Sequence, residues 1–149
     1  FLTKCEDELA KCLVNNTIPS LELQEAIAVC KVSAVEEAID LCFRLKQEVG
    51  SYALMAGRGF DQMDFLQCCK FAEGDSRILS QKLARDRYKL LTKSGSVEVC
   101  DEETQIASNL ASSMKEELLY HDAQTAWNKS YKLVYALASA RISHVFNNY

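Results

Sequence analysis

One long apolar stripe constrains the fold of this chain more than any other feature of its sequence. Over residues 22–49, apolar side chains recur every three or four positions, which is the repeat of one face of an α-helix. Charged side chains lie largely off this face, and Gly50 supplies a stop signal. We therefore predict one amphipathic helix of about 28 residues. The stripe consists of Leu23, Ile27, Cys30, Ala34, Ala38, Leu41, Leu45 and Val49.

The rest of the chain also favours helices. Its 5 Gly and 1 Pro are few for an all-β fold, which needs both residue types in its turns. Periodicity and turn signals predict further helices over residues 2–14, 61–72, 76–93, 101–121 and 123–146. Because short connections make neighbouring helices antiparallel, we expect an all-α fold. It would be a single domain over residues 1–149, a disulfide-tied bundle of about five to six helices, mostly antiparallel up-and-down.

Cysteine content indicates the compartment. The chain has 7 Cys in 149 residues, which is many for a cytosolic domain and ordinary for an extracellular one. Two Asn-x-Ser/Thr sequons, at Asn15 and Asn128, are candidate glycosylation sites. We therefore predict a secreted, extracellular glycoprotein. The alternative is a cytosolic helical protein whose free cysteines are buried in its core.

Helix register predicts two disulfides. In an antiparallel hairpin, residues that are equidistant from the turn lie level with each other. This rule makes Cys5 level with Cys30 across the turn near residue 17, and Cys42 level with Cys68 across the connection near residue 55. Cys69 would serve almost as well as Cys68.

Three cysteines remain after these pairings. Cys5 and Cys12 are about 10.5 Å apart along one helix, beyond the reach of about 7 Å between the Cα atoms of a disulfide. Cys12 therefore needs a partner on another element, which would be Cys69 or Cys100. One thiol would stay free, and we expect it to be buried.

The sequence contains no motif that names a reaction or a metal. It lacks Cys-x-x-Cys, His-Glu-x-x-His and Gly-x-Ser-x-Gly patterns. The two histidines, His121 and His144, would form a nucleophilic pair only with the leftover thiol beside one of them. We expect a protein that is not an enzyme and has no cofactor and no metal. An enzyme that uses the leftover thiol is the weaker alternative.

Charge and hydropathy narrow the class of partner. The net charge is −4, and the sequence has no concentrated basic surface of the kind that nucleic-acid binding needs. No run of about 18 apolar residues occurs, so we predict no membrane span. The classes of partner that remain are a protein and a small apolar ligand.

Two groups of apolar residues are candidates for contact with a ligand or partner. Trp127, Tyr131 and Tyr135 fall at i, i+4 and i+8 on one face of the predicted last helix. Phe60 and Met63 belong to a second apolar concentration near residues 54–71. The first group fits a plain core, a partner surface or a ligand cavity. The second fits a capping element of the bundle or a lid.

Two hypotheses of function follow. The first is a binding protein that docks on a macromolecule as an inhibitor or modulator, because a rigid helical scaffold loses little entropy on binding. The second is a carrier that holds a small apolar ligand among its helices. A carrier should contain a closed apolar cavity of a few hundred Å³ or more. A docking protein should have a filled core and an exposed apolar patch with a polar rim.

Overall fold

The computed structural model describes residues 1–72, 74–93 and 101–148. Over these ranges the chain forms seven α-helices and two short 3₁₀ helices, and no strand. The prediction of an all-α fold is confirmed, and the predicted count of five to six helices is too low. The chain divides into two compact units, Phe1–Leu79 and Ser80–Tyr149. The expectation of a single domain stays a prediction.

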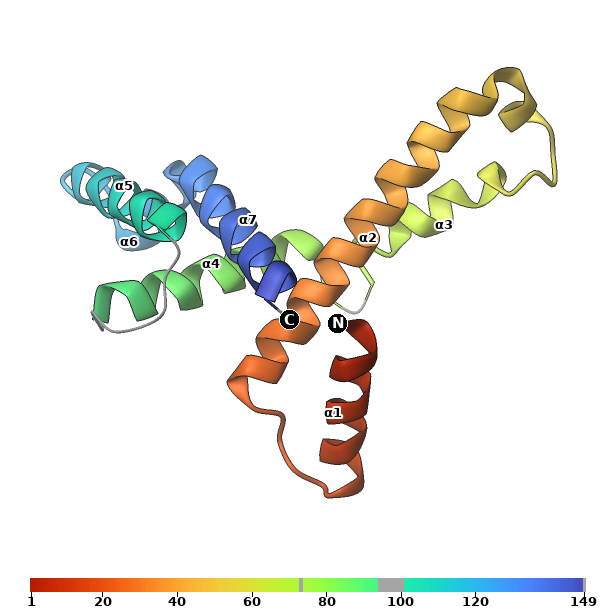
Figure 1. Cartoon of the computed structure of the whole chain (residues 1–149). Helices are drawn as coiled ribbons and strands as arrows, with labels where there is room; N and C mark the ends of the chain where they lie inside the picture. Colours follow the sequence, from red (N-terminus) through yellow and green to blue (C-terminus); the bar gives the residue numbers. More distant parts are fainter. Residues whose placement is uncertain (73, 94–100, 149) are drawn as a thin grey trace. The chain divides into compact units, whose positions relative to one another are not determined.

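The first unit begins with a helical hairpin. Helix α1 (Leu2–Val14) packs against α2 (Leu21–Val49), and the two run in opposite directions (Figure 1). Ser20 caps α2, since its hydroxyl accepts a hydrogen bond of 3.1 Å from the amide of Leu23. The hairpin encloses a small core of Cys5, Leu23, Ala26 and Cys30, against which Phe1, Cys12 and Ile27 pack.

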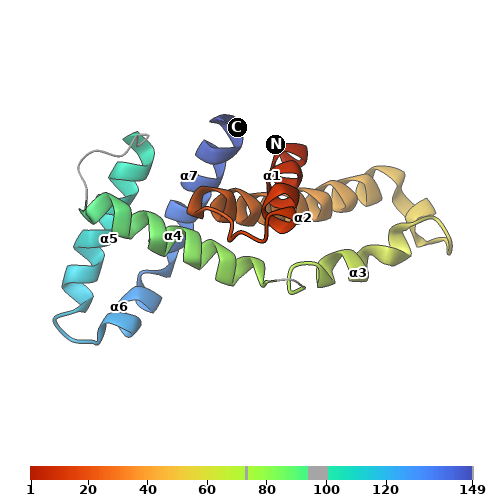
Figure 2. The same ribbon diagram turned by 90° about the horizontal axis from the view of Figure 1, so that it is seen from below.

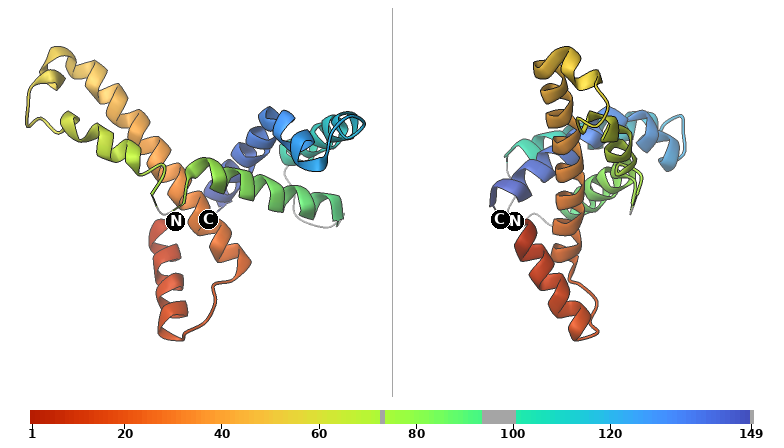
Figure 3. Two further views of the ribbon diagram at one scale, coloured as in Figure 1. Left: turned by 180° about the vertical axis from the view of Figure 1, so that it is seen from behind. Right: turned by 90° about the vertical axis from the view of Figure 1, so that its right-hand side faces the viewer.

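The predicted stripe of α2 is buried over only part of its length. Leu23 and Cys30 are buried, whereas Leu41, Leu45 and Val49 are 52%, 48% and 41% exposed. The elements that follow α2 are too short to cover its second half: η1 (Gly50–Leu54), η2 (Phe60–Gln62) and α3 (Met63–Cys68). Helix α3 returns antiparallel beside α2 (Figures 1 and 3).

The helix predicted over residues 61–72 is shorter than expected. Gly59 has a φ of +89°, a conformation that ends helical geometry, and η2 rather than an α-turn follows it. Helix α3 spans only Met63–Cys68. A tighter turn follows it, in which the amide of Phe71 donates to the carbonyl of Cys68 at 3.0 Å. Periodicity alone therefore overestimated the length of this helix.

The second unit contains a filled core. Helices α5 (Asp101–Glu117) and α7 (Tyr131–Asn148) pack antiparallel, and α6 (Ala123–Lys129) packs on both (Figure 2). Residues of α4 (Ser76–Lys93) complete the cluster. The buried members are Ala84, Ala107, Leu110, Trp127, Val134, Leu137 and Ala138.

The helix predicted over residues 123–146 is two helices. Helix α6 ends at Lys129, Ser130 follows as its C-cap, and α7 starts at Tyr131. Ser130 is buried, and its hydroxyl lies 2.8 Å from that of Ser113 on α5. Its carbonyl still accepts from the amides of Leu133 and Val134, so the apolar repeat continues through the break and conceals it in the sequence.

A buried ion pair joins α4 to α5. Arg87 and Glu103 are 2% and 0% exposed, and the guanidinium of Arg87 donates to the carboxylate of Glu103. Arg141 of α7 lies 3.7 Å from the same carboxylate. From the sequence, Glu103 is expected to favour the positive end of the helix dipole; the structure instead uses it in the core.

Candidate functional site

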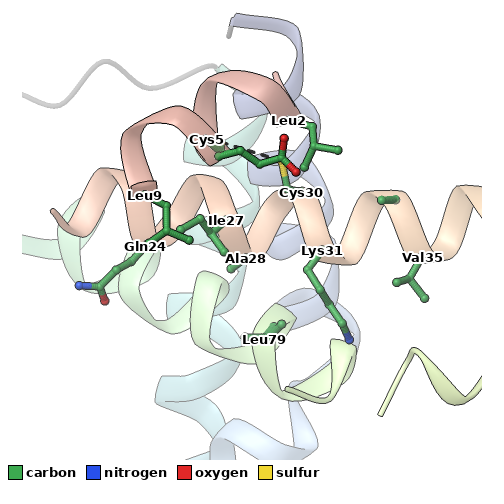
Figure 4. A pocket seen from close by; sticks show the side chains of 12 residues that line it. Leu2, Cys5, Leu9, Gln24, Ile27, Ala28, Cys30, Lys31, Val35 and Leu79 are labelled. Carbon is green, nitrogen blue, oxygen red and sulfur yellow. Dashed lines mark hydrogen bonds between the residues drawn. The ribbon is translucent and has the colours of Figure 1, made fainter. Parts of the chain in front are cut away.

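The first unit contains an apolar groove. It lies along α1 and the first half of α2 and is bounded by Leu79 in the first turns of α4 (Figure 4). Its volume is about 500 Å³. Leu2 at its edge is 57% exposed, so the space is a groove open to solvent rather than an enclosed cavity. Most of its wall is aliphatic and includes Leu9, Ile27 and Val35.

Helical periodicity builds both walls of the groove. On α1, Leu2, Cys5 and Leu9 are three and four residues apart, so they share one face. On α2, Ile27 and Lys31 are related in the same way. Ile27 belongs to the stripe that the sequence assigns to the core, whereas Lys31 lies off that stripe. The stripe of α1 is only partly used there, since Cys5 is buried while Leu2 stays exposed.

Lys31 brings a positive charge to the wall, and its ammonium is fully engaged. The Nζ atom donates to the carbonyls of Lys70 and Gly74 at 3.1 and 2.6 Å, and to the hydroxyl of Ser76 at 3.0 Å. An ammonium has three donors, so these acceptors use all of them. Lys31 therefore ties the segment before α4 to α2, and its methylene stem faces the groove.

Two further polar side chains line the groove. Gln24 donates its amide to the carbonyl of Pro19 at 2.9 Å, so its donor is directed to the turn between α1 and α2. Glu6 of α1 is exposed and adds a carboxylate to the wall. The groove is thus an apolar surface with one negative group and one cation that is already bound.

Cys5 and Cys30 face each other at the groove. Their sulfur atoms are 4.0 Å apart, whereas a disulfide bond is about 2.05 Å long. Burial raises the pKa of the Cys30 thiol to about 11, and the neighbouring Cys5 adds to this effect. Cys30 is therefore protonated near neutral pH and is a poor nucleophile. The register rule correctly places these residues level with each other.

The other predicted disulfides are not formed in the structure. All six described cysteines are free thiols. Cys12 and Cys42 are half-buried, and Cys68 and Cys69 are exposed at the end of α3, where the thiol of Cys69 contacts the carbonyl of Phe65 at 3.5 Å. Because α3 is short, its last residues face solvent rather than a partner helix. Cys100 lies outside the described residues.

The aromatic residues predicted as a site come together in the second unit. Trp127, Tyr131 and Tyr135 line a pocket of about 90 Å³, in which Gln81 donates to the hydroxyl of Tyr135 at 3.2 Å. Ligand pockets are typically about 300–1,000 Å³, so this space is too small. Trp127 is buried and contacts Tyr88 edge to face, with the ring centroids 6.1 Å apart. Trp127 belongs to the core, whereas Tyr131 is 54% exposed, and contact of these aromatics with a ligand or partner stays a prediction.

Phe60 and Met63 also lie away from the groove. Both are half-buried, in η2 and at the start of α3. Of the predicted site residues, only Cys5 and Cys30 line the groove. Sequence analysis missed Leu2, Leu9, Ile27 and Val35 as site residues. Their periodicity was visible, but nothing in it distinguishes a groove wall from a core.

The two sequons differ in their surroundings. Asn15 is exposed directly after α1. Asn128 is exposed on α6 and accepts a hydrogen bond of 3.0 Å from Gln124, while the Ser130 of its sequon is buried. In the folded chain Asn15 is therefore the more accessible of the two positions.

Among the described residues, His, Cys, Asp and Glu side chains do not gather in threes around a point that could hold a metal ion. No helix in the described ranges is both long and apolar enough to cross a membrane. Compared with family models, curated proteins and solved structures, the chain matches none of them.

Proposed function

We propose that this chain is a secreted, non-enzymatic binding protein that holds a small apolar ligand in the groove of its first unit. The observation that carries the proposal is the groove itself. Its volume of about 500 Å³ and its mainly aliphatic wall match the size and chemistry of ligand pockets. A macromolecular inhibitor was the first expectation. The space is an open groove and not the closed cavity expected of a carrier, and its volume and aliphatic wall are what favour the carrier.

Burial of apolar surface would drive binding. Removing roughly 300 Å² of apolar surface from water contributes about 7 kcal/mol. Loss of translational and rotational freedom opposes this gain, and the open side of the groove leaves part of the ligand wet. We therefore expect affinity in the micromolar range rather than the nanomolar range.

A disulfide between Cys5 and Cys30 fits this function. The two sulfurs face each other at 4.0 Å and would have to approach to about 2.05 Å for the bond to form. Exchange with an oxidised dithiol of the secretory pathway would form the bond and return that oxidant to its reduced form. The bond would join both walls of the groove and stabilise the hairpin by about 3–4 kcal/mol on the chain-entropy model. Support for secretion remains the cysteine content and the two sequons.

Filling the groove tests the proposal. Ala34 lines the groove and is exposed, so Ala34→Trp adds a large apolar side chain to the site without crowding a core. Ala10 of α1 is exposed and does not line the groove, which makes Ala10→Trp the matched control. Titration with an apolar naphthylamine dye should show at least about tenfold weaker binding for Ala34→Trp and unchanged binding for the control. Equal affinity of the two variants for the dye would show that the groove is not the binding site.

A second candidate function, docking on a protein, is favoured by exposed apolar side chains on η1, on α3 and just after α3. Leu54, Phe65 and Phe71 are 78%, 72% and 61% exposed, and they follow the uncovered stripe of α2. Large exposed apolar patches mark interaction surfaces. A photo-crosslinking residue at position 54 should capture a specific protein from extracellular fluid. The same residue at the exposed position 105 of α5 should not capture it.

A further inference from the structure

We infer that the groove takes one extended aliphatic chain of about twelve to fourteen carbons. The inference rests on the proposed function and adds the shape and the length of the ligand to it. It follows from the way in which the lining residues are distributed along the helical hairpin.

The lining residues of α1 and α2 form one continuous strip along the hairpin. Cys5 lies opposite Cys30, with the two sulfur atoms 4.0 Å apart, and Leu9 and Leu2 lie on the two sides of Cys5 (Figure 4). Because the helices are antiparallel, counting outward from the thiol pair puts Leu9 and Leu2 level with positions of α2 that fall within residues 24–35. This is the range over which α2 lines the groove, so both walls cover the same stretch of the hairpin.

The length of the strip sets the length of the ligand. Gln24 and Val35 are the outermost lining residues of α2 and are eleven positions apart, which is about 16.5 Å along a helix. An extended chain of single carbon–carbon bonds advances about 1.25 Å per carbon. A straight chain of about twelve to fourteen carbons therefore reaches from one end of the groove to the other.

The mean width of the groove suits a single chain. Its volume of about 500 Å³, spread over this length, gives a mean cross-section of roughly 30 Å². Carbon atoms in contact stay about 4 Å apart, so one methylene chain needs roughly 15–20 Å². One chain fits with room to bend, whereas two chains side by side would fill or exceed the space.

The chemistry of the wall also suits an aliphatic chain. Aliphatic side chains recur along the strip, from Leu9 through Ile27 to Val35. Among the residues that the structure describes, no aromatic ring lines the groove. Contacts with methyl and methylene groups are individually weak and add up along the length of a chain. Leu2 is 57% exposed, so the open side lets a polar head group of the ligand stay in water.

A series of straight-chain carboxylates tests the inference, because only the length of the ligand changes along it. The full chain is loaded with the naphthylamine dye at pH 8, and acids of eight to sixteen carbons are added below the concentrations at which they aggregate. Each added carbon should strengthen displacement of the dye about threefold up to twelve to fourteen carbons, because it buries one more methylene group. Further carbons extend beyond the groove, and each should add less than about 1.5-fold.

The other outcomes separate the inference from the proposed function. A constant gain per carbon through sixteen carbons, or a gain that ends before about ten, would overturn the inference and leave the proposed function in place. Dye that binds and is displaced by none of the acids would overturn the inference as well. Failure of the dye and of every acid to bind would overturn the proposed function.

A pair of variants tests whether the groove itself sets the length limit. Val35→Trp fills one end of the groove, and the indole reaches roughly 4 Å farther than the side chain of valine. The gain per carbon should therefore end at chains about three carbons shorter than in the wild type. Leu41→Trp adds the same ring to an exposed position of α2 that does not line the groove, and it should leave the limit unchanged. An unchanged limit in Val35→Trp, with helices intact by circular dichroism, would contradict the inference.

Discussion

Among the described residues, the unit Phe1–Leu79 leaves more of its large apolar side chains in contact with water than the unit Ser80–Tyr149 does. Leu110 and Leu137 are fully buried between α5 and α7 in the second unit. In the first unit the buried cluster is small and includes two cysteines, and the second half of α2 keeps its stripe exposed. The difference suggests a division of work: the second unit is stabilised by packing, and the first unit keeps apolar surface free for binding.

The largest effect is expected from the buried ion pair of the second unit. Glu103→Gln leaves the buried guanidinium of Arg87 without its counter-charge, and we expect a loss of about 3–5 kcal/mol in the free energy of unfolding. Urea unfolding followed by Trp127 fluorescence measures it, because the chain has 1 Trp and it lies in this unit.

A double variant tests the reason for that loss. Arg87→Met together with Glu103→Leu removes both charges and fills the space with apolar atoms, so most of the lost stability should return. A double variant as unstable as Glu103→Gln would show that the charges are not what matters at this position.

A matched pair of leucines tests the difference in packing. Leu110→Ala opens a cavity in the core of the second unit and should cost about 3 kcal/mol. Leu41→Ala changes an exposed position of α2 and should stay within about 0.5 kcal/mol. Hydrogen exchange of peptides from each unit reports the two values separately. A loss above 1.5 kcal/mol for Leu41→Ala, roughly half the core value, would mean that the stripe of α2 is covered in solution.

Local patterns predicted the helices well because the signals are local. The 3.6-residue repeat, the scarcity of Gly and Pro, and cap residues such as Ser20 act within a few residues of one another. The break at Ser130 escaped prediction because its cause is a contact with Ser113 on α5, which lies 17 residues away. The length of α3 escaped prediction because the apolar repeat continues to residue 72, whereas the α-helical backbone ends at Cys68.

The candidate site was harder to predict because it depends on where two helices separate. Leu9 and Ile27 were placed on apolar stripes, but a stripe becomes a core or a groove according to what covers it. The level position of Cys5 and Cys30 was predictable, because hairpin register is a count along the chain. The engagement of Lys31 by three acceptors from residues 70–76 leaves no trace in the sequence.

The thiol pair gives the stability of the first unit a dependence on pH. Burial raises the pKa of Cys30 from 9.0 to about 11, so the folded chain holds this proton more tightly than the unfolded chain. The resulting stabilisation is complete below pH 9 and is lost as the pH rises toward 11. With reduced protein, the difference in stability between the wild type and Cys30→Ala should shrink by roughly 1–2 kcal/mol over this range. A constant difference would mean that Cys30 does not lose its proton there.

The smallest effects are expected at two N-terminal helix caps, one in each unit. The cap of α2 is a neutral residue and the cap of α6 is a carboxylate. Ser20 caps α2 through a neutral hydroxyl, and Ser20→Ala should cost about 1 kcal/mol at any pH. Asp122 caps α6 by accepting from the amides of Gln124 and Thr125 at 2.9 and 3.0 Å.

The amide and hydroxyl of Thr125, with the amide of Gln124, lower the pKa of Asp122 below 3.8. A depressed pKa stabilises the folded chain above the unfolded value, and this stabilisation is lost as the pH falls through the folded value. Hydrogen exchange at the start of α6 should therefore accelerate in acid for the wild type and show no such step for Asp122→Asn. The first turn of α2 should show no acid step in either protein. An equal acid response at both caps would assign the effect to general acid unfolding and remove the distinction between a charged and a neutral cap.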